Sequence, residues 1–142
     1  MQELLNGSQF QKLLDRDSAK LRRKYDLKKV DFKIVKYISK SASYDRMKAL
    51  VDLELFSEEE LAGSLKRLYK QNLIDVVTDK STSEPKELKL TRAGEDLWKQ
   101  IQNNHKKATE VMFKGMTEEQ VQTFQRLSRM ILDNIEAELK TE

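Results

Sequence analysis

Hydrophobic residues recur at helical spacing over most of the chain and alternate with polar residues in two short stretches. The three-to-four-residue spacing predicts helices over residues 8–25, 30–41, 44–53, 57–72, 92–114 and 117–139. Strict alternation predicts strands over 73–78 and 87–91. The stretch between them, 79–86, is polar and contains the single proline, so the two strands are expected to form a hairpin. Residues 26–29 and 39–43 are expected to be a break and a loop.

Two helix starts are marked by capping boxes. Ser57 is followed three residues later by Glu60, and Thr117 is followed by Gln120. In this pattern each side chain of the pair bonds the backbone N–H of the other residue, which satisfies two donors at the helix N-terminus. Asn72, at the end of the 57–72 helix, tolerates the left-handed conformation that often ends helices.

The order of elements predicts a mainly α fold of the α+β type. Three short helices followed by a two-stranded wing form a winged helix-turn-helix, predicted over residues 30–94. Long helices flank it at 1–29 and 95–142, and their apolar stripes exceed what a small winged domain can cover. We therefore expect a homodimer held by these flanking helices, with the following interface residues: Phe10, Leu13, Leu14, Leu21, Val121, Phe124, Ile131 and Ile135.

Composition excludes several classes of function. The 142 residues include no cysteine, one histidine and four glycines. A disulfide framework, a thiolate nucleophile and a cysteine-based metal site are therefore ruled out, and His105 alone cannot build a metal site. No glycine-rich phosphate loop is present. We expect no cofactor, no metal and no enzyme activity. With no membrane-length apolar run and no secretory signal, we expect a cytoplasmic protein without membrane contact.

Charge points to a polyanion as partner. The net charge is +3, but residues 20–94 alone carry 18 Lys and Arg against 12 Asp and Glu. The densest part, residues 20–36, has eight positive and two negative side chains. A basic middle between near-neutral ends is typical of nucleic-acid binding. A solvated helix surface is the simpler alternative for any single run of lysines.

Three segments resemble the MarR family, the multiple-antibiotic-resistance regulators of bacteria. Residues 90–95 (LTRAGE) resemble the family's Leu-Thr-x-x-Gly step from the wing into the next long helix. Residues 57–74 fit its recognition helix and following strand without a gap, and residues 115–119 (GMTEE) resemble the link between its last two helices. The resemblance covers nearly the whole chain. It implies a dimeric transcription regulator that binds double-stranded DNA with the 57–72 helix and the 79–86 wing.

The resemblance also implies a cavity for a small aromatic ligand between the dimer arm and the winged domain. Trp98, beside Leu97 and Ile101, could line such a cavity. The alternative is that this tryptophan belongs to the hydrophobic core.

The chain departs from the family pattern where DNA would be read. The family presents small polar or basic groups at the start of its recognition helix, where this chain has Glu58, Glu59 and Glu60. Exposed carboxylates repel phosphates, at a cost of about 1 kcal/mol or less each. The family's wing arginine, which enters the minor groove, corresponds to Ser83. We therefore expect weaker and less selective DNA binding than is usual for the family.

Resemblance and charge together give the predicted DNA-contacting residues. They are Arg46, Lys48, Ser57, Glu58, Glu59, Ala62, Gly63, Lys66, Arg67, Lys80, Ser83 and Lys86. The rival hypothesis is a protein-interaction module on the same fold, in which the acidic helix start has ended specific DNA reading.

Overall fold

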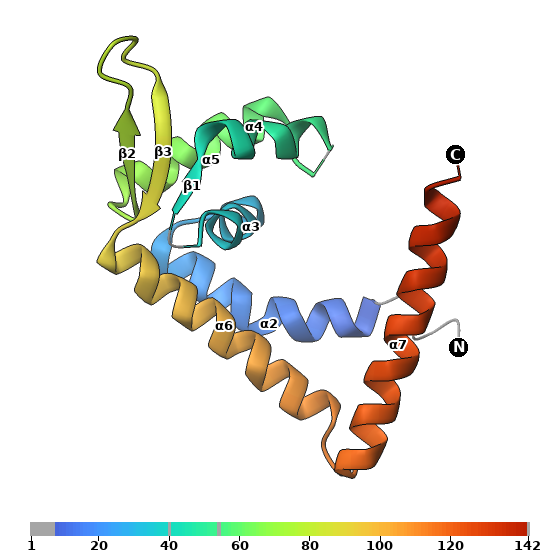
Figure 1. Cartoon of the computed structure of the whole chain (residues 1–142). Helices are drawn as coiled ribbons and strands as arrows, with labels where there is room; N and C mark the ends of the chain where they lie inside the picture. Colours follow the sequence, from blue (N-terminus) through green and yellow to red (C-terminus); the bar gives the residue numbers. More distant parts are fainter. Residues whose placement is uncertain (1–7, 40, 54, 142) are drawn as a thin grey trace. The chain divides into compact units, whose positions relative to one another are not determined.

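The structure, a computed structural model, describes residues 8–39, 41–53 and 55–141. The chain divides into two compact units at residue 106. The long helix α6 (Arg92–Met112) begins in the first unit and ends in the second, which also holds α7 (Glu118–Leu139) (Figure 1). The first unit contains, in chain order, α2 (Ser8–Tyr25), α3 (Lys29–Ile38), β1 (Ser41–Ser43), α4 (Tyr44–Asp52), α5 (Glu58–Lys70), β2 (Ile74–Thr78) and β3 (Pro85–Leu90).

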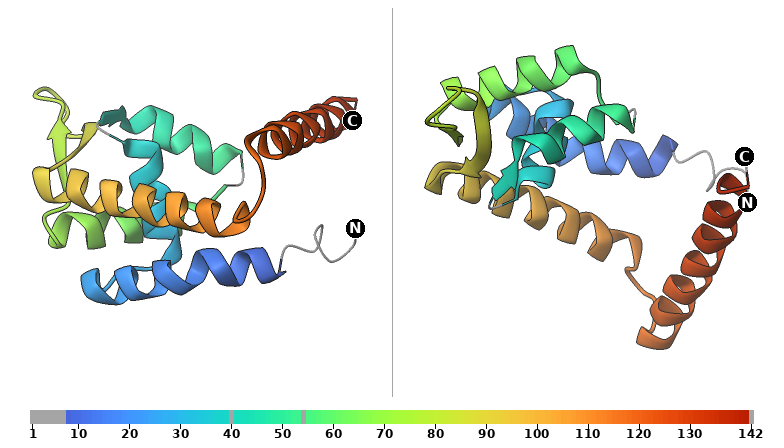
Figure 2. Two further views of the ribbon diagram at one scale, coloured as in Figure 1. Left: turned by 90° about the horizontal axis from the view of Figure 1, so that it is seen from below. Right: turned by 45° about the horizontal axis from the view of Figure 1, so that its top comes forward.

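The fold is mainly α with a winged helix-turn-helix, as the sequence predicts. Helix α5 contacts both α3 and α4, and the β2–β3 hairpin projects beyond these helices (Figure 2). The first helix has the predicted bounds. The predicted 30–41 helix is shorter, because Ser39 takes a φ of 45° and ends it. Residues 85 and 86, predicted in the loop, are the first residues of β3.

One strand was not predicted. Residues 41–43 were expected to be loop, but they form β1 and pair antiparallel with β3, giving the sheet order β1-β3-β2. Ala42 lies opposite Leu88, and both are buried. Three residues are too short to show an alternating pattern, and their partner strand is distant in sequence. Ser43 ends this strand and also caps α4, since its Oγ accepts a hydrogen bond from the Arg46 N–H at 3.1 Å.

The core of the first unit lies among α3, α4, α5, the sheet and the first part of α6. Each of these elements turns one face inward, which is the pattern expected of helices and strands that share one core. The largest side chains that are fully buried there are Ile34, Ile38, Met47, Leu68, Leu73, Ile74, Leu88 and Leu97.

The Leu-Thr-x-x-Gly segment joins the end of α5 to the start of α6. Thr91 Oγ1 donates to the Asn72 carbonyl at 2.7 Å and accepts from the Gly94 N–H at 3.0 Å. The Thr91 N–H donates to the Leu73 carbonyl at 3.0 Å. A Cβ on Gly94 would lie 2.0 Å from that same carbonyl oxygen. The motif therefore allows α6 to begin directly against the residues that follow α5.

The second unit begins within α6 and contains a turn and α7. Gly115, with φ of 82°, ends the turn, and the predicted capping box is present, since the Thr117 side chain accepts from the Gln120 N–H. Phe113 and Phe124 meet edge to face, with ring centroids 5.5 Å apart. No residue of α7 is buried. No helix in the described ranges combines the length and apolarity needed to cross a bilayer.

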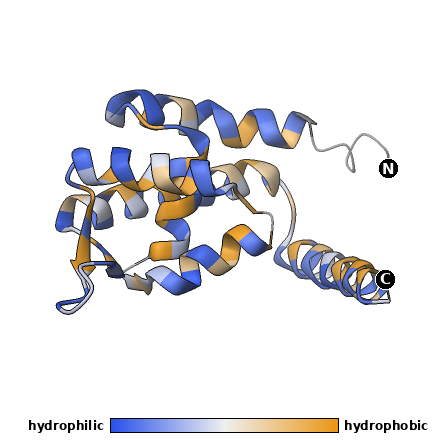
Figure 3. Ribbon diagram, turned by 90° about the horizontal axis from the view of Figure 1, so that it is seen from above, coloured by the Kyte–Doolittle hydropathy of each residue, from blue (hydrophilic) through white to orange (hydrophobic). Residues whose placement is uncertain are grey.

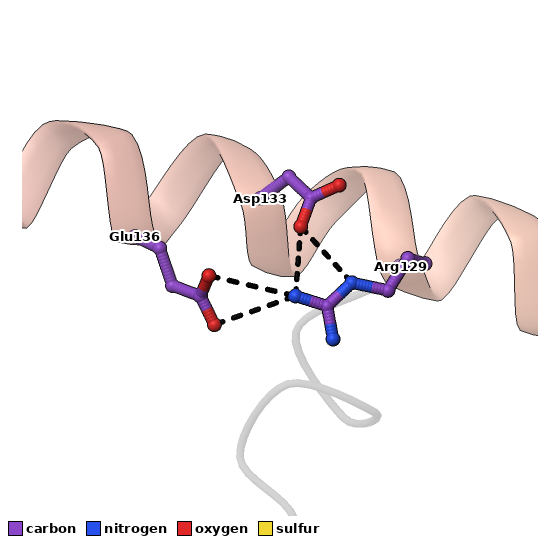
Figure 4. Close-up of polar contacts among 3 residues, drawn as sticks. All are labelled: Arg129, Asp133 and Glu136. Atoms are coloured by element: carbon purple, nitrogen blue, oxygen red, sulfur yellow. Dashed lines mark hydrogen bonds and ion pairs between the residues drawn. The ribbon is translucent and has the colours of Figure 1, made fainter.

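Helix α7 has distinct polar and apolar positions. Arg129 donates from Nε and Nη2 to Asp133 Oδ1 at 2.9 and 2.7 Å, and Glu136 lies 3.4 Å from Nη2 (Figure 4). Hydrophobic positions recur along the rest of the helix (Figure 3). The exposed hydrophobic side chains of α7 are Phe124, Leu127, Met130, Ile131, Leu132, Ile135 and Leu139.

Candidate nucleic-acid interface

Helix α5 corresponds to the recognition helix of a winged helix-turn-helix. Leu61, Ser64 and Leu68 are buried and fix one face of the helix to the domain. The opposite face is open to solvent, and its exposed residues are Glu58, Glu59, Ala62, Lys66, Tyr69 and Lys70. The helical spacing of Leu61, Leu65, Leu68 and Tyr69 predicts that Tyr69 faces the core, but 62% of this residue is exposed. Its phenol adds a hydrogen-bond donor to this exposed face, beyond the DNA-contacting residues predicted from the sequence.

The acidic start of α5 has two different roles. Glu60 completes the predicted capping box, since its Oε1 accepts from the Ser57 N–H and Ser57 Oγ accepts from the Glu60 N–H, both at 3.0 Å. Glu58 and Glu59 are exposed, and neither side chain makes a hydrogen bond or ion pair with the part of the chain that the structure describes. These two carboxylates therefore face solvent as uncompensated negative charges.

Arg67 is turned inward, toward α3. Its Nε donates to Asp31 Oδ2 at 2.8 Å and its Nη2 donates to Asp31 Oδ1 at 2.7 Å. The Asp31 side chain is fully buried, whereas 30% of the Arg67 side chain is exposed. Asp31 Oδ2 also accepts from the Lys28 N–H at 2.8 Å, so the same carboxylate caps α3. Arg67 is one of the residues predicted to contact DNA, but two nitrogens of its guanidinium are bonded to this carboxylate.

The electrostatics of this pair favour the ionised form of Asp31. Burial by itself would raise the pKa of Asp31. The hydrogen bonds from Arg67 and from the Lys28 backbone outweigh that effect, so the pKa of Asp31 lies below its ordinary value. The carboxylate in turn raises the pKa of Arg67. The pair is therefore fully charged at neutral pH and adds no net charge to the surface.

The wing tip is a closed turn. The Asp79 N–H donates to the Glu84 carbonyl at 2.8 Å, and the Ser83 N–H donates to the Asp79 carbonyl at 2.9 Å. Asp79 Oδ1 also accepts from the Ser81 hydroxyl and N–H, and these bonds lower the pKa of Asp79. Ser83, at the family's arginine position, is exposed with φ of 60°. Lys80 and Lys86 are exposed on either side of the tip.

Helix α4 contributes two further cations. Arg46 lies in its first turn, and Lys48 lies with its Nζ 5.9 Å from the centre of the Tyr44 ring. Both side chains are exposed. The exposed cations of the predicted DNA surface are thus Arg46 and Lys48 on α4, Lys66 on α5, and Lys80 and Lys86 on the wing. Gly63, also predicted to contact DNA, is half-buried beside Arg67.

The predicted dimer-interface residues lie on two helices, α2 and α7, and differ in how exposed they are in the single chain. Leu21 is buried in the core of the first unit, so it has a structural role within one chain. Phe10 is 42% exposed, and Leu13 and Leu14 are half-buried. On α7, Val121 is half-buried, and the remaining predicted residues, Phe124, Ile131 and Ile135, are 37%, 49% and 50% exposed.

The predicted ligand-cavity residues pack inside the first unit. Leu97 and Ile101 are buried, and Trp98 packs against the same core. A separate hollow on the surface of α6 is open to solvent. Its lining side chains are polar: Lys99, Gln100, Gln102, Asn103 and Lys106. A small aromatic ligand stays a prediction.

Solved structures similar to this chain include transcription regulators of the MarR family. The reduced form of MarR from E. coli superposes with a TM-score of 0.69 at 18% identity, covering 93% of this chain and 96% of that one. A putative MarR-family regulator from Listeria monocytogenes, solved with a 26-mer DNA, gives 0.67 at 20% identity, with 91% and 85% covered. The chain has the MarR fold. No protein-family model matches it, and no curated protein gives a significant match.

A further structure extends the MarR comparison to a second DNA complex. MepR of S. aureus bound to DNA gives a TM-score of 0.64 at 14% identity, with 91% of this chain and 96% of that chain covered. The fold expected from residues 57–74, 90–95 and 115–119 is therefore confirmed over nearly the whole chain.

Proposed function

We propose that the chain is a divergent MarR-type transcription regulator that binds double-stranded DNA as a homodimer. The observation that carries the proposal is the MarR fold with an exposed α5 face and a projecting wing, since two of the similar structures are DNA complexes. A helix can enter the major groove while a wing lies along the adjacent backbone. A regulator of this kind acts in the bacterial cytoplasm and is not an enzyme.

The cations of the first unit supply most of the proposed affinity. Lys66 on α5, and Lys80 and Lys86 on the wing, are exposed, and none is neutralised by a carboxylate in the described ranges. Arg46 and Lys48 extend the positive surface along α4. Counterion release from phosphates makes such contacts strongly dependent on salt. We do not assign Arg67 to this set, because Asp31 neutralises it.

Base reading on this surface is limited. The groups at the start of α5 are the Ser57 cap, the carboxylates Glu58 and Glu59, and the small residues Ala62 and Gly63. Ser57 is occupied in capping, and the carboxylates oppose phosphates. Tyr69 is the exposed aromatic residue of the same face. We therefore propose that phosphate contacts outweigh base contacts and that selectivity is modest.

The proposed dimer interface consists of residues of α7 and of the first half of α2. Six large apolar side chains of α7 are at least 47% exposed in the single chain. Exposed apolar surface on this scale marks an interface, and their three-to-four-residue spacing suits packing against another helix. Phe10, Leu13 and Leu14 are added from α2.

The proposal is tested by titrating a random-sequence duplex with the full chain at 50 and 200 mM salt. We expect binding that weakens steeply with salt, by about a hundredfold or more for five or more phosphate contacts. Lys66→Gln should weaken binding to all sequences and reduce the salt slope by about one. The matched control is Arg129→Gln, an exposed residue of α7 outside the proposed surface. Absence of binding at low salt would favour the protein-interaction module.

A further inference from the structure

The ion pair between Arg67 and Asp31 connects the proposed recognition helix to the helix beneath it. Two parallel hydrogen bonds, of 2.8 and 2.7 Å, join a guanidinium on α5 to a carboxylate on α3. A forked, planar contact of this kind fixes direction as well as distance. A single pair therefore constrains both the rotation of α5 about its axis and its position along α3.

Stability alone does not account for this pair. Placing a charge in a fully buried position costs desolvation energy, and well-packed apolar residues often stabilise a core equally well. Asp31 lies on the same face of α3 as Ile34, Val35 and Ile38, where an apolar residue would be expected. What the pair adds over an apolar contact is geometric specificity.

Gly63 is a second, independent feature of the same arrangement. It lies one turn before Arg67, and a Cβ at this position would be 3.2 Å from Arg67 Nη1. Glycine inside a helix is destabilising relative to alanine, and the φ angle of Gly63 is not positive, so backbone conformation does not require a glycine there. The glycine therefore leaves room for the guanidinium to reach across α5 toward Asp31.

We infer that Asp31, Arg67 and Gly63 are positioning residues for the proposed DNA-binding face. The inference rests on the proposed function and adds to it. The pair sets the placement of α5, and so determines whether Ala62, Lys66 and Tyr69 meet the duplex together with the wing. Arg67 contributes through geometry and not through charge on phosphate, because Asp31 neutralises it.

Charge and geometry make opposite predictions for Asp31→Asn. If Asp31 acted only as a negative charge near DNA, its removal would free the Arg67 cation, tighten binding and steepen the salt slope. If it positions α5, its removal weakens binding and leaves the slope unchanged. The sign of the change in affinity therefore separates the two roles.

The experiment is a double-mutant cycle in the full chain with Asp31→Asn, Arg67→Gln and both. The dissociation constant for one duplex is measured at several salt concentrations, with the melting temperature measured alongside. We expect each single variant to bind about tenfold more weakly at an unchanged salt slope, and the double variant to lose little more, as for residues acting as one unit. Lys66→Gln is the contrast, since it should change the slope.

Arg67→Lys keeps the positive charge but cannot form the two parallel hydrogen bonds of the guanidinium. This variant tests the inference if the other variants do not fold. We expect the same loss of affinity from it. Wild-type affinity in Arg67→Lys, or tighter binding by Asp31→Asn, would overturn the inference while leaving DNA binding by the wild-type chain intact. No DNA binding by the wild-type chain would overturn the proposed function, and this inference with it.

Discussion

Arg67 holds Asp31 across 36 residues of sequence, with both oxygens of the carboxylate engaged. The same carboxylate caps α3 through the Lys28 N–H. The buried Asp31 side chain thus caps the N-terminus of α3 and also bonds α5 through Arg67. The charge of Arg67, assigned to phosphates from its sequence position, is therefore paired with a buried carboxylate although 30% of its side chain is exposed.

The pair makes stability depend on pH. The pKa of Asp31 is lowered in the folded chain, so the stabilisation is present above the unfolded pKa of about 4 and is lost as pH falls through the folded value. Asp31→Asn should lower the free energy of unfolding at pH 7 by about 3 kcal/mol, because Arg67 loses its charged partner. Urea unfolding at pH 7 and at pH 3 measures this, and the deficit should shrink at the lower pH.

The control for that comparison is Asp133→Asn. Asp133 also accepts two hydrogen bonds from an arginine, but its side chain is 59% exposed (Figure 4). Exposed pairs contribute about 1 kcal/mol or less. A loss at Asp133 as large as that at Asp31 would contradict the role assigned to burial.

Gly94→Ala should destabilise the first unit. The added methyl group would lie 2.0 Å from the Leu73 carbonyl oxygen, and backbone must move to relieve the contact. We expect a loss of about 1–3 kcal/mol, as for other overpacked sites, measured by urea unfolding. Ala93→Ser, an exposed change one residue earlier, should have little effect. Wild-type stability in Gly94→Ala would show that the close approach of α6 is not required.

The acidic start of α5 should weaken DNA binding. Changing Glu58 and Glu59 together to Gln removes two exposed negative charges and should tighten binding by about two- to tenfold at low salt. Glu60→Gln should change affinity little, since glutamine also completes the capping box. A fluorescence titration on one duplex compares the three proteins. If Glu58→Gln alone abolished binding to one selected sequence, the carboxylate would be a base reader.

Ile131→Glu should dissociate the proposed dimer. Ile131 is 49% exposed in the single chain, so the substitution leaves the monomer folded but places a charge in the interface. Sedimentation at micromolar concentration should give twice 16.7 kDa for the wild-type chain and a lower mass for the variant. Arg129→Gln, on the polar side of α7, should keep the wild-type mass. A wild-type monomer would contradict the interface.

Local signals predicted much of this fold. The capping boxes at Ser57 and Thr117 depend on residues three positions apart, so sequence places both helix starts correctly. Tyr69 was misplaced because it follows Leu65 by one turn, yet it lies beyond the edge of the buried face. Helical spacing defines a stripe, but it does not define how wide the stripe is.

The parts that were missed depend on partners distant in sequence. Strand β1 has only three residues, and it exists because β3 supplies its hydrogen bonds. The Asp31–Arg67 pair likewise joins two helices that are separate in sequence. One signal was present: Asp31 shares a helix face with Ile34 and Ile38, and a carboxylate on an apolar face requires a cationic partner. Which cation fills that role follows only from the packing of α5 on α3.

The most direct test of the central claim is selection of tight-binding sequences from a random duplex pool with the full wild-type chain. A symmetric dimer that inserts one α5 from each protomer should enrich two inverted half-sites with centres about 10 base pairs apart. We predict such a pattern with modest preference, below the usual range of about 10³–10⁷ over non-specific DNA. A single asymmetric site, or a pool that stays random after repeated selection, would contradict the account.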